Sequence, residues 1–344
     1  MQQQKLNQLS YFIKLVIAVT VAIVAVAVSC CLGSSDTTLH DIWLYISGHK
    51  DELSKTAVII IGKVRFPRAL TAAIIGGSLA VIGSIMQGLF KNPMADPSVL
   101  GISSGSALGA SISILLGLSG PVIGASITGT YIAAIIGALV TWGIVFSIAR
   151  IGGEFDSSST LLAGIAISSI MTGLITMLMT LHKDNMEKIY MWMLGSFSFS
   201  TPSKLTVLAI AAACFLVIIF IFAPRIDVLK LGRETAITLG VNSSVTLGLL
   251  MTAASFLLAF CVANSGIIGF VGLIIPHVVS FFKVYKARQK AIMSFFVGAA
   301  FMVICDTIAK TIAAPGELAV GAVTSIIGAP YFLVLLLKNR RSRT

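Results

Sequence analysis

The chain has 344 residues, of which 57% are hydrophobic and 11% charged, and its mean hydropathy is +1.00. Soluble globular proteins carry about 25% charged residues, so this composition excludes an ordinary soluble domain. The formal net charge is +11, but no basic stripe with interleaved aromatic residues is present, which excludes the usual nucleic-acid-binding pattern. The composition predicts an all-α polytopic protein surrounded by membrane lipid, with no nucleic-acid partner.

Apolar runs long enough to cross a bilayer follow one another along the chain. A membrane-spanning helix needs about 20 apolar residues at a rise of about 1.5 Å each. The first run is long for a signal peptide, so we expect it to be retained as a helix. About ten spans are predicted, at 12–32, 66–90, 97–118, 122–149, 159–181, 203–223, 244–263, 266–284, 290–313 and 317–337.

The distribution of basic residues predicts the orientation of the chain. Placing both termini in the cytoplasm assigns fifteen Lys and Arg residues to that side and eight to the other, and the C-terminal tail and the 283–290 loop decide the count. An even number of spans agrees with this arrangement. The sequence therefore predicts a multi-pass protein with both termini cytoplasmic.

Glycine spacing predicts how the spans pack. Gly101, Gly105 and Gly109 recur every four residues, and Gly76 and Gly83 lie within the 66–90 span. Small faces of this kind let helix backbones approach closely in lipid. We expect helix packing to be their main role.

Two prolines mark the joint between the second and third spans. Pro93 and Pro97 stand four residues apart within 87–105. Unpaired backbone groups are costly in hydrocarbon, so this stretch is predicted to lie outside the bilayer core or against protein.

Charged residues near the ends of spans are the first candidate site. Arg65 and Arg68 open the second span, where they either reach the membrane interface or bind carboxylates of an external partner. Asp306 and Lys310 share one helix face. They either pair with each other, or Asp306 neutralises a charge on a neighbouring helix. Glu317 is interpreted as structural.

Residues 224–243 are the second candidate site. Gly232 separates two short amphipathic stretches, and Gly240 is a typical stop before the next span. Without a covering partner, the apolar side chains of this loop would be exposed. They are Ile226, Leu229, Leu231, Ala236 and Leu239.

No catalytic, ATP-binding or metal-binding pattern is present in the sequence. Gly62-Lys63 is followed by Val64 and lacks the earlier glycine of a phosphate-binding loop. The four histidines are scattered, and His277 is interpreted as polar packing rather than a ligand. We expect neither an enzyme nor a bound cofactor or metal.

Several motifs taken together resemble the permease subunits of type II ABC importers for iron siderophores, haem and cobalamin. The resemblance covers residues 60–337. It is carried by Arg65-Phe66-Pro67-Arg68, 87–105, 232–240, 266–277, Pro315-Gly316-Glu317-Leu318 and Gly328-Ala329-Pro330.

This resemblance implies a single transmembrane permease domain over 1–344 in a bacterial cytoplasmic membrane. It also implies several partner proteins. They are two ATP-binding subunits below, a substrate-binding protein above, and a second permease that makes a homodimer or heterodimer. It also implies roles for individual residues. Binding-protein docking is implied for Arg65, Arg68 and Lys310; ATPase coupling for Arg225, Leu229, Gly232, Arg233, Glu234, Ala236, Leu239 and Gly240; and a pathway gate for Asn92, Met94, Ser157 and Ser158.

The implied function is ATP-driven import of an iron chelate by alternating access, with haem or cobalamin as further cargo classes. Two alternatives remain. An ion-coupled secondary transporter would need a buried carboxylate, for which Asp306 is the candidate. A membrane-embedded enzyme would need clustered histidines or carboxylates at one depth.

Overall fold

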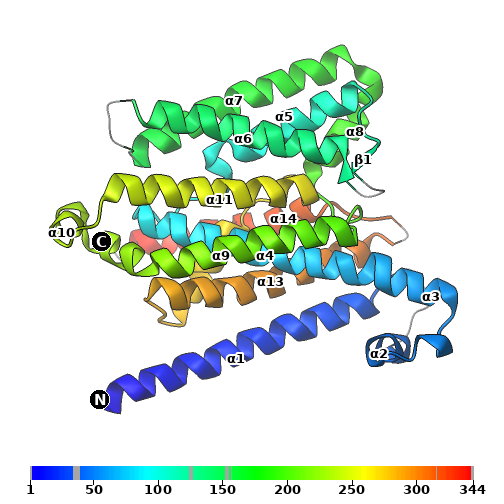
Figure 1. The fold of residues 1–344 in the computed structure, drawn as a ribbon, viewed down its shortest axis with the longest axis horizontal. Helices are drawn as coiled ribbons and strands as arrows, with labels where there is room; N and C mark the ends of the chain where they lie inside the picture. The colour runs from blue at the N-terminus through cyan, green and yellow to red at the C-terminus, as the bar shows by residue number, and fades with distance from the viewer. Residues whose placement is uncertain are drawn as a thin grey trace.

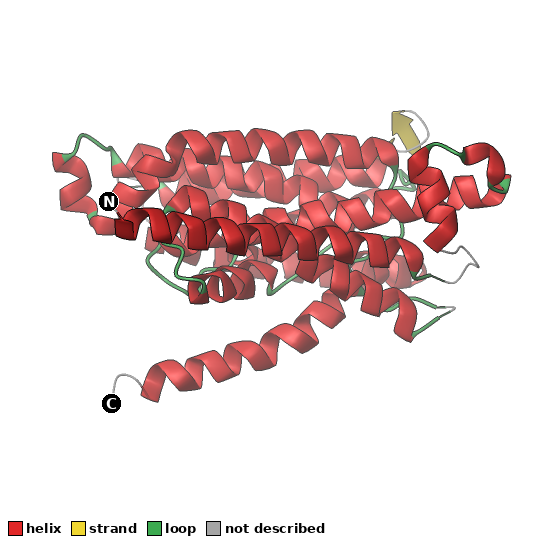
Figure 2. Ribbon diagram, turned by 90° about the horizontal axis from the view of Figure 1, so that it is seen from below, coloured by secondary structure: helices red, strands yellow, loops and turns green. Residues whose placement is uncertain are grey.

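The computed structural model describes residues 2–33, 39–123, 127–151, 155, 157–314 and 316–341. Its long helices run side by side along one axis (Figure 1), and within the described residues one small antiparallel hairpin, β1–β2, interrupts the helical fold (Figure 2). The elements in chain order are α1 (Gln2–Cys31), α2 (Leu39–Ser47), η1 (Lys50–Glu52), α3 (Lys55–Ile59), η2 (Ile60–Arg65), α4 (Phe66–Leu89), η3 (Pro97–Leu100), α5 (Ile102–Leu115), β1 (Pro121–Ile123), β2 (Ile127–Thr128), α6 (Gly129–Ala149), α7 (Ser157–Leu181), α8 (Lys183–Leu194), α9 (Pro202–Leu231), α10 (Arg233–Thr238), α11 (Ser243–Ser265), α12 (Val271–Phe281), α13 (Ala287–Ile312) and α14 (Val320–Arg341).

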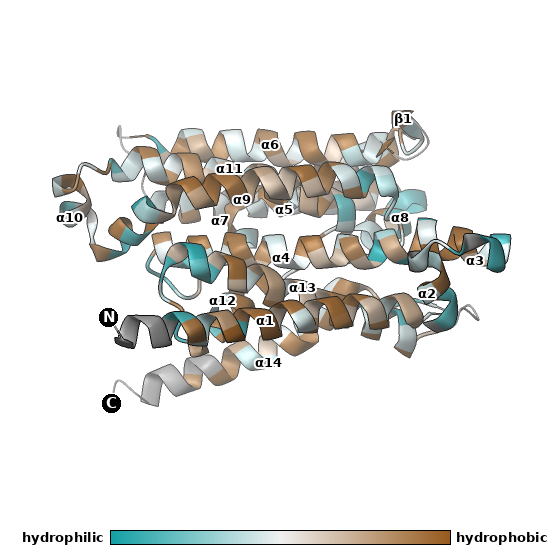
Figure 3. Ribbon diagram, turned by 60° about the horizontal axis from the view of Figure 1, so that its bottom comes forward, coloured by the Kyte–Doolittle hydropathy of each residue, from teal (hydrophilic) through white to brown (hydrophobic). Residues whose placement is uncertain are grey.

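The predicted fold class is confirmed. Of the described helices, 7 are long and apolar enough to cross a membrane, and shorter apolar helices form α5, α12 and the first part of α14. Each of the ten predicted spans overlaps one of these helices. Figure 3 shows hydrophobic residues along the helix shafts and hydrophilic residues gathered toward the two ends of the bundle, as expected for helices surrounded by lipid.

Three predicted spans are wrong at one boundary. The 66–90 span begins too late, because the helix runs from Lys55 through the π-helical η2 to Leu89, so Arg65 and Arg68 lie within it rather than at its start. The 122–149 span begins at Gly129, because the preceding residues form the hairpin and Thr128 caps α6 by accepting a hydrogen bond from the Tyr131 amide at 3.3 Å. The 203–223 span ends too early, since α9 continues through Pro224 to Leu231. The helix therefore extends into the predicted coupling loop.

Two other predicted spans are too long. The helix predicted from 97 starts at Ile102, because Gly101 has a φ of 81° and follows the short 3-10 helix η3. The helix predicted from 266 starts at Val271, because Gly266 and Phe270 both have positive φ. Each irregular segment breaks the helical pattern where apolar composition alone predicts continuity.

The two prolines of the joint differ, since Pro93 is exposed whereas Pro97 lies against protein, which is one of the two predicted placements. Pro97 is buried, and a Cβ added to Gly272 of α12 would lie 2.6 Å from Pro97 Cδ. Non-helical backbone at membrane depth is tolerated where other protein segments cover it. Here α12 provides that cover.

Close glycine contacts hold the helices together, which confirms the predicted packing role. Gly76 of α4 meets Gly298 of α13, backbone against backbone, and Gly83 meets Gly272 of α12. Gly105 of α5 packs against the Thr141 side chain and the Gly137 carbonyl of α6. α4 therefore lies at the centre of the bundle, and most of its span is buried.

The bundle has two distinct ends, which we name by the short helix at each. The α10 end carries α10 and both chain termini, and the α8 end carries α2, α3, α8 and the hairpin (Figure 1). The helix that leads to the C-terminus leans away from the other helices (Figure 2).

Candidate functional site

The three predicted docking cations lie at the α8 end, and each is already bonded within the chain. Arg65 is 7% exposed and Arg68 8% exposed, while Lys310 is partly buried. Their partners show what these charges do in the folded protein.

Arg68 is the centre of a hydrogen-bonded network that we call the Arg68 network (Arg68, Asp306, Glu317 and Ser198). Arg68 Nε donates to Asp306 Oδ1 and Oδ2 at 3.1 and 3.0 Å, and Nη2 donates to Oδ1 at 2.8 Å. Arg68 Nη1 donates to Glu317 Oε1 at 2.7 Å, and the Ser198 hydroxyl donates to the other Glu317 oxygen. The network joins α4, α13, the segment before α14 and the segment after α8.

The position of Asp306 decides between the two roles considered for it. Asp306 is fully buried and forms an ion pair with Arg68 on the neighbouring α4. A direct ion pair between Asp306 and Lys310 is not formed by these described side chains, so that expectation is wrong. Asp306 instead neutralises the charge of Arg68, because a buried guanidinium needs a carboxylate close by.

Arg65 and Lys310 both cap the C-terminal end of α1. Arg65 Nη1 donates to the carbonyls of Cys30 and Cys31 at 2.8 and 3.1 Å. Lys310 Nζ donates to the Ser29 carbonyl at 2.5 Å and to its hydroxyl at 3.0 Å. The last carbonyls of a helix lack intrahelical partners and carry partial negative charge. These two cations therefore fasten α1 to the end of η2, directly before α4, and to α13.

The capping of α1 could not be found from the sequence. Sequence reasoning placed Arg65 at the membrane interface or on a carboxylate of an external partner, whereas its charge acts on a helix that ends 34 residues earlier. Docking by Arg65, Arg68 and Lys310 stays a prediction, and a partner would meet side chains whose hydrogen bonds are already made.

Glu317 gives the Arg68 network a pH dependence. Burial alone would raise the pKa of Glu317, but hydrogen bonds from Arg68 and Ser198 outweigh it and lower the pKa below its usual value of 4.5. A lowered pKa stabilises the fold above the usual value, and this contribution is lost as the pH falls through the folded-state pKa.

Replacing Glu317 with Gln should therefore lower the thermal stability at pH 7, and the difference from the wild-type protein should shrink as the pH falls below the usual carboxylate range. Melting temperatures of both proteins in detergent across this pH range measure the effect. Glu187→Gln, an exposed change on α8, is the control. A difference that stays constant with pH would contradict an ionised Glu317 in the network.

The predicted coupling stretch lies at the α10 end and has the predicted break. Gly232 ends α9 with a φ of 125°, and Gly240 follows α10 with a φ of 73°. Glycine adopts such positive φ values without steric cost. The first helical stretch is the end of α9 rather than a separate piece.

The apolar side chains of the coupling stretch divide into exposed and buried groups. Leu231, Ile237 and Leu239 are 68%, 59% and 59% exposed, and we call these three the α10 patch. Ile226 and Ala236 are buried, so the expectation that they are exposed is wrong. They pack inward because the end of α9 and α10 fold against neighbouring segments.

The charged coupling candidates differ in how the structure holds them. Arg225 is exposed and stacks on the Phe222 ring at 4.9 Å, and Glu234 is exposed. The remaining apolar candidate, Leu229, is half-buried. The side chain of Arg233 lies outside the described residues.

Sequence reasoning missed Asp227, which lies inside the last turns of α9. Its Oδ1 accepts hydrogen bonds from Lys230 Nζ at 2.7 Å and from the Ala287 amide at 2.9 Å. The spacing of Asp227 and Lys230 on one helix was a usable signal for the first contact. The second joins residues 60 apart in the chain, and no local pattern predicts it.

The predicted gate residues belong to two segments at the α10 end. Asn92 Oδ1 accepts a hydrogen bond from the Met94 amide at 2.9 Å, and Met94 is 45% exposed. Ser158 is exposed at the start of α7, and the side chain of Ser157 is outside the described residues. These segments meet further along, where Gly164 lies against the Val99 carbonyl. Between the described side chains of Asn92, Met94 and Ser158 the structure forms no hydrogen bond.

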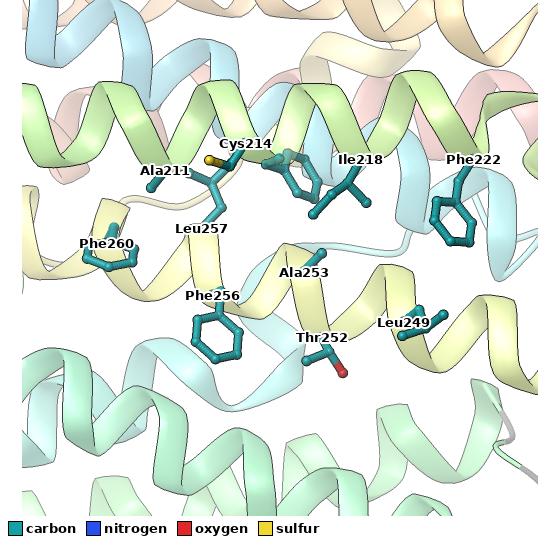
Figure 4. Close-up of a pocket in the computed structure, with 11 residues that line it drawn as sticks. Ala211, Cys214, Ile218, Phe222, Leu249, Thr252, Ala253, Phe256, Leu257 and Phe260 are labelled. Carbon is teal, nitrogen blue, oxygen red and sulfur yellow. The ribbon is translucent and has the colours of Figure 1, made fainter.

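An apolar groove of about 460 Å³ lies between α9 and α11 (Figure 4). Cys214 and Phe256 lie on its two sides, and Phe256 is 48% exposed. The Thr252 hydroxyl in its wall donates to the Gly248 carbonyl, so it is already used. This lining suits an apolar ligand rather than a charged chelate.

Comparison with known proteins agrees with this architecture. Residues 21–338 match the model of the FecCD transport family. The cobalamin import system permease protein of Halobacterium salinarum is 37% identical over 82% of this chain and 74% of the relative. The hemin transport system permease protein of Yersinia pestis is 36% identical over 82% of this chain and 84% of the relative.

A solved structure is similar over nearly the whole fold. An inward-facing metal-chelate type ABC transporter superposes with a TM-score of 0.81 at 27% identity, covering 94% of this chain and 98% of that one. The family match extends from α1 to α14 and includes both the Arg68 network and the α10 patch. The chain belongs to the FecCD transport family.

Proposed function

We propose that this chain is the permease subunit of an ABC importer that moves an iron chelate, either a siderophore complex or haem, across a bacterial cytoplasmic membrane, with cobalamin as a further cargo class. The observation that carries the proposal is the match of residues 21–338 to the FecCD transport family. The helical bundle and the hemin and cobalamin permeases among its relatives support it. The whole chain, 1–344, acts as one transmembrane domain.

The α10 end faces the cytoplasm and receives the ATPase subunits. The exposed Leu231, Ile237 and Leu239 support this assignment, because three large apolar side chains at a water-facing end call for a covering protein. Both termini lie at this end (Figure 1). ATP hydrolysis belongs to the partner, since the chain has no phosphate-binding loop.

The α8 end faces outward and receives the substrate-binding protein. Arg65, Arg68 and Lys310 gather there with Asp306 and Glu317, and three cations against two carboxylates leave one net positive charge. Such a cluster favours an acidic partner surface. Docking then acts on residues that also hold α1, α4 and α13 together.

A second permease, identical or related, completes the pathway. α7 and α14 expose large apolar side chains, among them Leu162 at 68% and Ile326 at 74%. Alternating access would open the pathway to one side at a time, with Asn92, Met94 and Ser158 near its cytoplasmic end. A pathway without strong ligands suits release of the cargo.

The ion-coupled alternative is weaker than the importer. It needs Asp306 as a coupling carboxylate, but Asp306 is fully buried and held by Arg68 through three hydrogen bonds. An ion site would have to replace this pairing.

Reconstitution in proteoliposomes tests the proposal. The chain is purified with the ATPase and binding protein encoded beside it, and uptake of a ferric hydroxamate, haem and cobalamin is measured. We expect uptake of one cargo class, and only when ATP is present on the side of the membrane that carries the ATPase and the binding protein is present on the other side. Uptake by the chain alone in response to an ion gradient would establish the alternative instead.

A further inference from the structure

The end of α9 is fastened to the start of α13 by one carboxylate. Ala287 is the first residue of α13, and the preceding Lys286 makes no side-chain cap. Asp227 Oδ1 accepts the Ala287 amide at 2.9 Å, which satisfies a free amide and places a negative charge at the positive end of the helix. Asp227 therefore supplies from α9 the cap that α13 lacks.

Lys230 strengthens this junction. Its Nζ donates to Asp227 Oδ1 at 2.7 Å and to the Tyr285 carbonyl at 3.2 Å. The Lys230 stem also lies over α4, where a Cβ on Gly88 would be 3.5 Å from its Cε. One turn of α9 thus contacts the loop before α13 and the end of α4.

The junction is adjacent to the α10 patch. Asp227 lies four residues before Leu231, and α9 is helical between them. Gly232 is the joint between α9 and α10. If α10 moves, the end of α9 moves with it, and the contact of Asp227 with Ala287 is the next contact along the chain to be affected.

α13 links this junction to the α8 end of the bundle. Its 26 residues extend about 39 Å at 1.5 Å per residue. Asp306 near its far end holds Arg68, and Lys310 caps α1. Along its length α13 packs on α4 through the backbone contact of Gly298 with Gly76.

We propose that Asp227 is a positioning residue that couples movement of α10 to movement of α13, so that a push on the α10 patch is felt at the Arg68 network. This inference rests on the proposed function. The second contact of this region, from Arg288 Nη2 to the Phe220 carbonyl at 3.0 Å, comes from an exposed side chain. The Asp227 carboxylate is the contact that joins the α13 N-terminus to the turn of α9 next to α10.

The test uses the full complex with Asp227→Ala and Asp227→Glu. In Asp227→Ala we expect the ATPase to copurify and hydrolyse ATP as in the wild-type complex, while the amount of chelate taken up per ATP falls about threefold, as expected for losing the contacts of a carboxylate that is 39% exposed. Asp227→Glu keeps the carboxylate and should recover most of the uptake per ATP. Arg288→Ala, which removes the second contact between α13 and α9 but leaves the Asp227 carboxylate in place, is the matched control.

Hydrogen exchange provides a direct reading of the contact. The Ala287 amide should exchange faster in Asp227→Ala than in the wild-type protein, whereas amides in the middle of α13 should not change. Unchanged uptake per ATP in Asp227→Ala, or parallel loss of ATPase copurification and uptake, would overturn the coupling role. Failure of the proposed function is seen separately, as a wild-type complex that takes up no chelate with ATP.

Discussion

Replacing Asp306 with alanine should strongly destabilise the protein, so that only a small fraction of it is recovered folded. Arg68 would keep its charge in a site where it is 8% exposed, the three hydrogen bonds to Asp306 would be lost, and the partly exposed Glu317 would be the remaining carboxylate of the Arg68 network. Removing one partner of a buried ion pair costs about 3–5 kcal/mol, which is a large part of a typical total stability of about 5–15 kcal/mol. The yield of monodisperse protein and its melting temperature in detergent measure the effect.

A double variant separates loss of pairing from loss of packing. Arg68→Met combined with Asp306→Leu removes both charges and fills the space with apolar atoms, so it should be much more stable than Asp306→Ala alone. Glu187→Ala removes an exposed carboxylate beyond the first turn of α8 and should leave the melting temperature unchanged. If Asp306→Ala melts like the wild-type protein, the Arg68 network does not stabilise the α8 end.

The same geometry decides how docking is tested. Reversing Arg68 to Glu would place a carboxylate beside Asp306 and Glu317, so a loss of transport in that variant would report on folding before it reported on docking. Reversing Arg65 would in turn free the end of α1. Binding-protein affinity therefore needs to be compared only among variants that keep the wild-type melting temperature.

Local patterns in the sequence were enough to predict most of the fold. Apolar runs located the helices, and Gly232 and Gly240 marked the break around α10, because these features depend on a residue and its near neighbours. The predicted lengths of α5 and α12 were wrong because the ends of these helices depend on contacts with distant residues. The left-handed conformation of Phe270 follows from how this segment packs, and an apolar run does not reveal it.

The candidate site was predictable only as a set of charges. Sequence position showed that Arg68 and Asp306 lie near span ends, but they are 238 residues apart, and their pairing depends on α4 lying beside α13. The role of Arg65 depends in the same way on where α1 ends. In this bundle the sequence predicts which charges enter the membrane region, and tertiary packing decides which carbonyl or carboxylate each one meets.

Replacing Gly83 with alanine should have the second large effect. A Cβ at Gly83 would lie within 3.0 Å of three backbone atoms of Gly272 on α12, and backbone atoms cannot rotate away as a side chain can. α4 and α12 would have to separate, and overpacking of this kind costs about 1–3 kcal/mol or more. We expect a lower melting temperature and a further decrease for Gly83→Val.

Gly173→Ala is the matched control for this change, because Gly173 also lies within a membrane-length helix but has no atom within 4 Å of an added Cβ. Alanine favours helix over glycine by about 1 kcal/mol, so Gly173→Ala should be neutral or slightly stabilising. Since Gly272 also touches Pro97, separation of α4 from α12 would disturb the loop that holds Asn92 and Met94, and transport should fall together with stability. Equal melting temperatures for the Gly83 and Gly173 variants would mean that the α4–α12 contact is looser than the structure describes.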